Sequence, residues 1–251
     1  MIEVRNLTRT YGKKANTFQA LRGVSFRIPS AATVAIIGKS GSGKSTLMHL
    51  MGGLDKPTSG DILVDGKTLG DLKRRDMDRF RAQDLGFVFQ SFFVEANQTC
   101  YQNVSLPLEI NRIPRRRRQK LAEQALEQVE LFDKIKSKAS TLSGGQKQRL
   151  AIARAIVNSP KILMADEPTG NLDSATGDKI MELLFGLNRR LQCTLIIVTH
   201  DAELAARCQY QIELKDGVIV HVRKPQTAAN KEAIDKSRTA VRRTAPERPI
   251  I

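Results

Sequence analysis

The apolar positions of the chain fall into short runs that alternate with stretches of helical spacing. Four compact apolar runs, each bounded by turn or polar residues, occur at Thr33–Ile37, Leu85–Phe89, 162–165 and Thr194–Thr199. Short continuous runs of this kind are typical of strands buried on both faces of a parallel sheet. The pattern therefore predicts a parallel sheet that contains these four segments.

Helical spacing occurs between these runs. Within residues 119–131 apolar side chains recur three to four positions apart, as on one face of a helix. Helices also fit residues 44–51, 144–157 and 176–191. Strands that alternate with helices indicate an α/β fold with a mostly parallel sheet. Because no strong strand pattern appears from about residue 91 to 159, we expect a helical subdomain inserted between two strands.

Turn residues and the end of the chain complete this outline. Asp-Gly pairs at residues 65–66 and 216–217 lie between apolar runs and predict hairpins, since glycine supplies the positive φ of such turns. Residues 223–251 contain eight Lys or Arg, three Asp or Glu, three Pro and few large apolar side chains. This composition predicts one domain over residues 1–222 and a basic, disordered or loosely attached tail.

The charge of the chain adds a class of partner. Lys and Arg number 41 against 26 Asp and Glu among 251 residues, which gives a formal charge of +15. Such a chain suits nucleic acid, an anionic membrane surface or nucleotide phosphates, and charge alone does not choose among them. The apolar runs are far shorter than the ~20 residues of a membrane-spanning helix, and no secretory signal opens the chain. Three cysteines without a CxxC pair argue against a disulfide scaffold or zinc site.

The segment after the first predicted sheet strand matches a phosphate-binding loop. Residues 38–45 fit G-x-x-x-x-G-K-S/T between a strand and a helix. The glycines let backbone N–H groups point at phosphate oxygens, and the helix N-terminus adds positive potential. Lys44 would reach the β- and γ-phosphates, and Ser45 would bind Mg²⁺. The candidate nucleotide contacts are Gly38, Lys39, Ser40, Gly41, Ser42, Gly43, Lys44, Ser45 and Thr46.

Two further segments carry chemistry. The run at residues 162–165 ends in Asp166 and Glu167, of which the first could hold Mg²⁺ and the second could polarise an attacking water. Ser143 could cap a helix whose first residues, Gly144 and Gly145, expose bare N–H groups to an anion. Each segment also has a plainer interpretation, as solvated acids at a strand end and as an ordinary helix start.

Taken together, these segments resemble the nucleotide-binding subunit of an ATP-binding-cassette (ABC) transporter over about residues 1–222. The matching segments are residues 38–45, Gln90, residues 142–146, Asp166 with Glu167, residues 171–173 and residues 199–201. The resemblance implies a P-loop NTPase fold with an N-terminal antiparallel β subdomain and an inserted helical signature subdomain. It also implies an enzyme that hydrolyses ATP to ADP and phosphate, coupled to transport.

The resemblance further implies a shared site. In this family two subunits associate head to tail, and each ATP lies between the phosphate loop of one chain and the signature of the other. One chain would present Lys44, Ser45, Gln90, Asp166, Glu167 and His200, and its partner would present Ser143, Gly144, Gly145 and Gln146. Mg²⁺ would be held by Ser45, Gln90 and Asp166. Tyr11 would stack on adenine, His200 would contact the γ-phosphate, and Asp173 would communicate across the dimer.

A narrower resemblance concerns the membrane partner. Residues 52–60, 85–90, 103–108 and 167–173 are similar to the lipoprotein-release, macrolide-export and cell-division ATPases. The similarity implies a separate integral membrane permease and a place on the cytoplasmic face of the cell membrane. An ATPase that regulates a membrane partner in cell division or envelope remodelling, without transport, is the alternative. Residues 91–101 depart from the subgroup where it meets its permease, which leaves the partner and substrate open.

Clusters of basic residues remain unexplained by the site. Residues 115–118 are four arginines at a predicted helix start, where positive charge opposes the helix dipole. With residues 73–75 and the tail, they are either solvated surface or a contact for anionic lipid headgroups. A soluble ABC ATPase acting on nucleic acid is a third function class. The resemblance argues against it, because repair relatives carry long insertions and translation relatives carry two cassettes.

Overall fold

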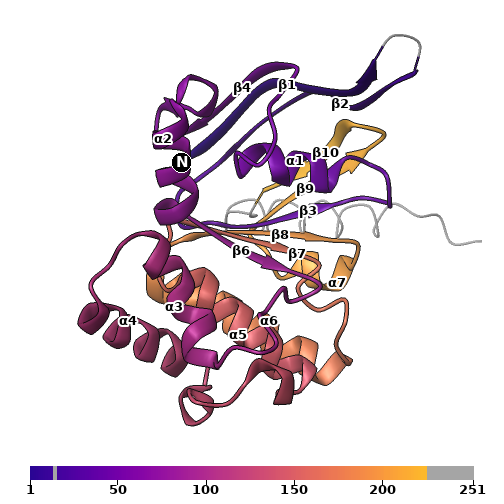
Figure 1. The fold of residues 1–251 in the computed structure, drawn as a ribbon. Coiled ribbons are helices and arrows are strands. Elements are labelled where there is room, and N and C mark those ends of the chain that lie inside the picture. Colours follow the sequence, from indigo (N-terminus) through magenta and orange to yellow (C-terminus); the bar gives the residue numbers. More distant parts are fainter. Residues whose placement is uncertain (14–15, 225–251) are drawn as a thin grey trace, which may run out of the picture.

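The computed structural model describes residues 1–13 and 16–224 (Figure 1). The strands are β1 (Ile2–Lys13), β2 (Asn16–Ile28), β3 (Thr33–Ile37), β4 (Ser59–Val64), β5 (Lys67–Thr68), β6 (Leu85–Phe89), β7 (Ile162–Asp166), β8 (Thr194–Thr199), β9 (Tyr210–Lys215) and β10 (Val218–Arg223). The α-helices are α1 (Lys44–Met51), α2 (Arg74–Arg79), α3 (Cys100–Ile110), α4 (Arg115–Gln128), α5 (Gly144–Ile156), α6 (Ser174–Leu191) and α7 (Ala202–Ala206).

A six-stranded sheet runs through the middle of the molecule in the order β10-β9-β3-β8-β7-β6. Its strands are parallel except for β10, which pairs antiparallel with β9. The four predicted sheet strands are β3, β6, β7 and β8, and β7 is one residue longer than the apolar run because Asp166 continues it. The α/β fold with a mostly parallel sheet is therefore confirmed.

The continuous apolar runs are explained by burial on both faces of this sheet. Val34 and Ile36 of β3 pack with the antiparallel sheet and α1, whereas Ala35 between them packs with the helices on the other side. The strands β7 and β8 divide their side chains between the two cores in the same alternating way. A strand covered on both faces has no polar face, so its sequence does not alternate.

The second sheet is antiparallel and lies beside α1 (Figure 1). Its order is β2-β1-β4-β5, which confirms an N-terminal antiparallel β subdomain. Both Asp-Gly pairs lie in the tight turns that were predicted: one joins β4 to β5, and the other joins β9 to β10. In each turn the aspartate and the glycine both have positive φ, 47° and 80° in the first and 49° and 79° in the second.

The chain between β6 and β7 contains α3, α4 and α5, which contact one another on the far side of the central sheet (Figure 1). The bounds that apolar spacing predicted for one helix were wrong, whereas the arginine run at residues 115–118 does begin a helix, as predicted. This helix extends over residues 115–128 rather than 119–131, because Pro114 precedes its first turn and Glu130 takes a positive φ of 57° after its end. The apolar spacing marked only the part that faces the core, where Ala122, Ala125 and Leu126 are buried.

The predicted tail, residues 223–251, lies outside the described residues except for its first two. Arg223 is the last residue of β10, and Lys224 follows it. Among the residues that the structure describes, no helix combines the length and the apolar character that crossing a membrane requires.

The three cysteines are buried in the fold. Cys100, Cys193 and Cys208 are free thiols, and burial raises the pKa of Cys193 to about 11 and that of Cys208 to about 12. Thiols held in the protonated form are weak nucleophiles, so these residues act as small apolar side chains.

Candidate active site

The carboxyl ends of β3, β6, β7 and β8 open onto one cleft of about 450 Å³. Ligands of open parallel sheets bind at this edge. The cleft is lined by Phe18, Ala20, Ser40, Gly41, Gly43, Lys44, Ser45, Thr46, Gln90, Asp166, Glu167 and His200. Four motifs that are far apart in the sequence, namely the phosphate loop, Gln90, the carboxylate pair and His200, therefore meet in one place.

The phosphate loop joins β3 to α1, which begins at Lys44 as predicted. Gly38 and Gly43 have φ of 157° and 100°, and an added Cβ at Gly38 would lie 2.2 Å from the carbonyl oxygen of Leu214. The loop therefore needs glycine at both positions. The Lys44 Nζ folds back and donates to the carbonyl oxygens of Gly38 at 2.8 Å and of Lys39 at 3.0 Å.

Several donors of this loop are unused. The Ser42 hydroxyl is buried and has no hydrogen-bond partner among the described residues. The backbone amides of Gly41 and Gly43 also find no acceptor in that part of the chain. Ser42 is not among the residues that line the cleft, whereas Gly41, Gly43 and Lys44 are, and unpaired amides beside a lysine ammonium suit phosphate oxygens. An ordinary glycine-rich turn would not require this combination.

Asp166 ends β7 beside the loop and is half-buried. Burial raises the pKa of its carboxyl group, and the neighbouring carboxylate of Glu167 raises it further. Lys44 and His49 act in the opposite direction. Desolvation and a like charge both disfavour the ionised form, and an adjacent cation would offset both. The position is therefore suited to a carboxylate that shares its site with a cation.

Glu167 is held by the last residue of β8 and the residue after it. Its Oε1 accepts from the backbone amide of His200 at 3.1 Å and lies 2.8 Å from the ring Nδ1 of that residue. Its Oε2 accepts from the Thr199 hydroxyl at 3.3 Å. The backbone of Glu167 has a φ of 44°, which is uncommon for a residue with a side chain and is concentrated at functional sites. The two predicted catalytic side chains are thus in direct contact.

Gln90 lines the same cleft and contacts the segment after Glu167. Its Nε2 donates to Asn171 Oδ1 at 3.3 Å, and Asn171 Nδ2 donates back to the Gln90 carbonyl at 2.9 Å. An added Cβ at Gly170 would lie 2.7 Å from the Gln90 Nε2, so the glycine leaves room for this position of the Gln90 side chain. The side chain predicted to bind Mg²⁺ is therefore coupled to residues 171–173.

The signature segment lies elsewhere. Ser143 caps α5 in a capping box: its hydroxyl accepts from the Gln146 amide at 3.3 Å, and the Gln146 side chain accepts from the Ser143 amide at 3.0 Å. Ser143 and Gly144 are exposed, and none of residues 142–146 is among those lining the cleft. The chain therefore carries a second helix start with unshielded amides that does not contribute to its own cleft.

Tyr11, the predicted adenine platform, lies near the end of β1 and is not among the residues that line the cleft. It pairs across the β1–β2 hairpin with Phe18, and Phe18 rather than Tyr11 is among the residues that line the cleft. The Tyr11 hydroxyl donates to Asp55 Oδ2 at 2.8 Å, and the Arg9 guanidinium lies 4.5 Å from its ring centroid. Sequence reasoning missed Phe18, because the irregular register of the hairpin gives no simple alternation from which to place it.

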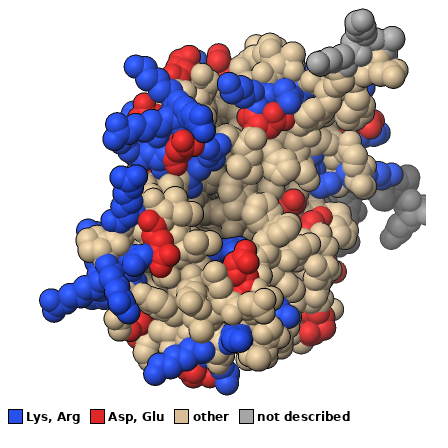
Figure 2. All heavy atoms as spheres, in the orientation of Figure 1, with Lys and Arg blue, Asp and Glu red and all other residues tan. Residues whose placement is uncertain are grey.

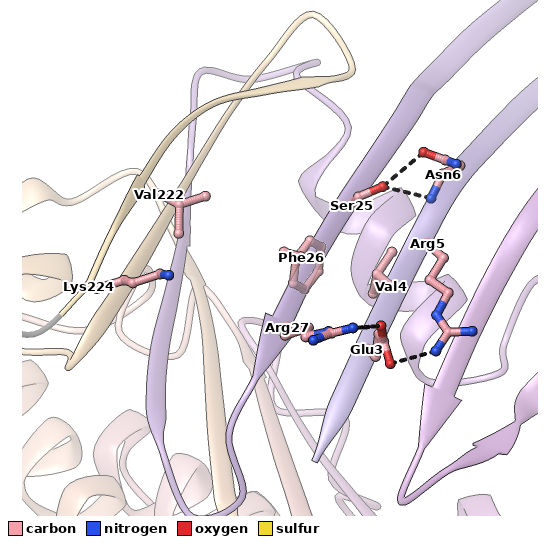
Figure 3. Close-up of a pocket in the computed structure, with 9 residues that line it drawn as sticks. All are labelled: Glu3, Val4, Arg5, Asn6, Ser25, Phe26, Arg27, Val222 and Lys224. Carbon is pink, nitrogen blue, oxygen red and sulfur yellow. Dashed lines mark hydrogen bonds and ion pairs between the residues drawn. The ribbon is translucent and has the colours of Figure 1, made fainter.

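A larger cavity of about 630 Å³ lies between β1, β2 and the end of β10 (Figure 3). Its polar groups are largely paired with one another. Glu3 accepts from Arg5 at 2.9 Å and from Arg27 at 2.8 Å, and Asn6 pairs with Ser25. These pairs leave few free donors to bind a ligand. The smaller cleft is therefore the candidate active site.

Comparison with known proteins agrees with this geometry. The sequence profile described as "ABC transporter" matches residues 21–170. The chain belongs to the ABC transporter family. Two "Lipoprotein-releasing system ATP-binding protein LolD" relatives are similar: one from Syntrophus aciditrophicus is 44% identical over 88% of this chain and 99% of its own, and one from Syntrophotalea carbinolica is 45% identical over 87% and 96%.

Solved structures of ABC cassettes share the fold. A dimeric ATP-binding cassette in a post-hydrolysis state, bound to ADP and Pi, superposes with a TM-score of 0.82 at 40% identity, over 90% of this chain and all of that one. A cassette named cbiO1 from Clostridium perfringens, part of an ABC transporter complex, has a TM-score of 0.81 at 32% identity over 96% of each chain. This protein is accordingly an ATP-binding and ATP-hydrolysing ABC subunit.

Proposed function

We propose that the chain is the ATPase subunit of a lipoprotein-release or macrolide-export type transporter and drives a separate membrane permease. The observation that carries the proposal is the separation of two phosphate-binding elements. The cleft holds the phosphate loop, while the exposed start of α5 lies outside it. ATP bound in one cleft would gain its remaining donors from the Ser143 hydroxyl and the Gly144 and Gly145 amides of a second copy, so ATP would join two chains head to tail.

Each residue has a role in this proposal that fits its contacts. The Lys44 ammonium would exchange its carbonyl partners for the β- and γ-phosphates. Glu167 would orient and polarise the attacking water, and His200 would hold that carboxylate and contact the γ-phosphate. Asp173 caps α6 by accepting from the Thr176 amide at 2.9 Å, next to the signature glycines, and would relay the state of one site to the other.

Mg²⁺ fits the cleft. Ser45, Gln90 and Asp166 line it together, and the carboxyl group of Asp166 has a pKa raised by burial that a cation would lower. These three residues would hold the ion, which would neutralise charge on the phosphate oxygens when bound. The oxygen-rich donor set is the kind that Mg²⁺ prefers.

The proposed partner and location rest on relatives. Two proteins more than 40% identical over almost their whole length are named lipoprotein-releasing system ATP-binding proteins. By that similarity we place the chain on the cytoplasmic face of the cell membrane, bound to an integral permease.

The test uses Glu167→Gln, which keeps the hydrogen-bonding shape of the side chain but cannot take up a proton. We expect this variant to bind Mg-ATP, to lose most ATP hydrolysis and to elute as a dimer of doubled mass, whereas the wild type with ADP stays monomeric. A variant that binds ATP but remains monomeric at every concentration, even with its co-purified membrane partner, would contradict the head-to-tail arrangement. Co-purification with an integral membrane protein would support a membrane partner, either for a transporter or for a regulatory ATPase, and would argue against a soluble ABC ATPase that acts on nucleic acid.

A further inference from the structure

One edge of the molecule gathers basic side chains that the active site does not use. Figure 2 shows Lys and Arg atoms concentrated along the side that carries α2 and α4 in Figure 1. We define the basic edge as the exposed residues Lys73, Arg74, Arg75, Arg112, Arg115, Arg116 and Arg117. None of these side chains forms an ion pair with another described residue.

The two halves of the basic edge are adjacent in the fold although some 40 residues separate them in sequence. Asn111, which precedes Arg112, donates from its side chain to the carbonyl oxygen of Ala82 at 3.3 Å, in the segment that follows α2. Nearby cations that do have acidic neighbours are paired: Arg118 with Glu109 at 2.8 Å, and Arg79 with Asp76. The basic edge therefore carries positive charge that no acidic side chain of the described residues pairs.

Folding does not account for this surplus. Arg115, Arg116 and Arg117 occupy the first turn of α4, which has no acidic residue there and no side-chain cap. Positive charge at a helix N-terminus opposes the helix dipole, so these arginines weaken the helix. Their exposure removes any packing role for their guanidinium groups. An interaction with something outside the chain is therefore needed to offset the stability that α4 loses.

We infer that the basic edge binds the anionic lipid headgroups of a membrane surface. The inference rests on the proposed membrane partner, and it concerns a surface that lies outside the nucleotide cleft. Ile110, at the end of α3 beside the arginines, is 70% exposed. Cations grouped around an exposed aliphatic side chain suit a headgroup layer with an apolar interior beneath it. The segments 73–79 and 112–118 contain no aromatic residue, whereas sites for single-stranded nucleic acid stack bases on aromatic rings.

The test measures binding of the full chain to vesicles of phosphatidylcholine with and without phosphatidylglycerol, in the absence of nucleotide. We expect binding only to the anionic vesicles and a loss of binding as salt rises. Neutralising Arg115→Gln, Arg116→Gln and Arg117→Gln together should weaken it by about tenfold or more, since each basic residue near such a surface contributes on the order of 1 kcal/mol. A second triple variant, Lys73→Gln with Arg74→Gln and Arg75→Gln, should weaken it similarly.

A matched control removes three exposed charges elsewhere, with Lys136→Gln, Lys138→Gln and Lys179→Gln. We expect the control to bind within about twofold of the wild type, and all variants to retain soluble ATPase activity. Every variant keeps residues 223–251, so the tail cannot produce a difference between them. Equal losses in all three variants would show that only net charge matters and would overturn the inference, as would tighter, edge-dependent binding to a DNA duplex.

The outcome is independent of the dimerisation test. Vesicle binding needs neither ATP nor the permease. A chain that dimerises with ATP but ignores anionic vesicles would overturn this inference and leave the proposed function intact.

Discussion

At the scale of single residues, Tyr11 and Phe18 are the two aromatic candidates for stacking on the adenine of ATP. We expect Tyr11→Ala to weaken ATP binding by roughly tenfold, because loss of a base–aromatic stack costs about 1–3 kcal/mol. Binding of inorganic triphosphate should not change, since the phosphate loop is untouched. Competition of both ligands against a fluorescent ATP analogue measures the two affinities. Tyr11→Phe, which keeps the ring but loses the hydrogen bond to Asp55, should behave like the wild type.

Phe18→Ala gives the comparison within the same hairpin. Phe18 is 61% exposed and lines the cleft, so its removal should also reduce the affinity for ATP. If Phe18→Ala weakens ATP binding while Tyr11→Ala does not, the base rests on Phe18 alone and the stacking role assigned to Tyr11 is wrong. Equal losses for ATP and triphosphate in Tyr11→Ala would instead indicate a damaged hairpin.

These residues also show how far the sequence predicts the site. The placement of Lys44 and Ser45 in the cleft follows from local spacing, because the loop geometry is fixed within eight residues. The pairing of Glu167 with His200 joins two neighbouring strands, and parallel strand order alone suggests that their ends meet. Phe18 could not be placed, since its position depends on register shifts in the β1–β2 pairing, such as the one between Arg9 and Thr10.

At the scale of elements, the β1–β2 pairing carries an ion-pair cluster that should make stability depend on pH. Glu3 and Arg27 are register partners, and hydrogen bonds from Arg5 and then Arg27 lower the pKa of Glu3 from 4.5 to about 2. A depressed carboxyl pKa stabilises the fold above pH 4.5, and this contribution is lost as the pH falls from 4.5 through 2. We expect Glu3→Gln to lower the melting temperature at pH 7.

Measuring the melting temperature of Glu3→Gln at several pH values provides the control. The difference in melting temperature between wild type and Glu3→Gln should shrink steadily below pH 4.5, because the wild-type carboxyl group then also becomes neutral. Asp61→Asn, which changes a more exposed acid on the neighbouring β4, should show a smaller effect at pH 7. A difference that stays constant from pH 7 to pH 3 would mean that packing, rather than charge, holds Glu3 in place.

Elements were easier to predict in the central sheet than around it. The strands β3, β6 and β8 match their apolar runs residue for residue. A strand that is covered on both faces is apolar along its whole length, so the apolar run and the strand have the same bounds. In β2 the adjacent residues Ala20 and Leu21 are both buried, which breaks the alternation expected of a strand with one exposed face. Apolar spacing alone placed the start of α4 at residue 119, because its first arginines face solvent and carry no apolar period.

At the scale of the whole molecule, the decisive feature is that the signature residues 142–146 do not line the cleft of their own chain. The start of α5 packs against the first turn of α6: an added Cβ at Gly145 would lie 2.6 Å from the Thr176 side chain. Ser143 and Gly144 at this helix start are exposed and do not line the cleft. A substitution there should affect association without affecting the binding of ATP to a single chain.

We expect Ser143→Arg, introduced into Glu167→Gln, to abolish the ATP-dependent dimer. The arginine removes the hydroxyl that caps α5 and places a bulky side chain where the γ-phosphate would approach. ATP affinity of the monomer, measured by equilibrium dialysis, should change less than about threefold, because the cleft contains none of the altered atoms. Ser143→Thr keeps a capping hydroxyl and should still dimerise, since threonine caps helices almost as well as serine. If Ser143→Arg dimerises with ATP as readily as its parent, the signature does not contact nucleotide, and the two chains associate through another surface.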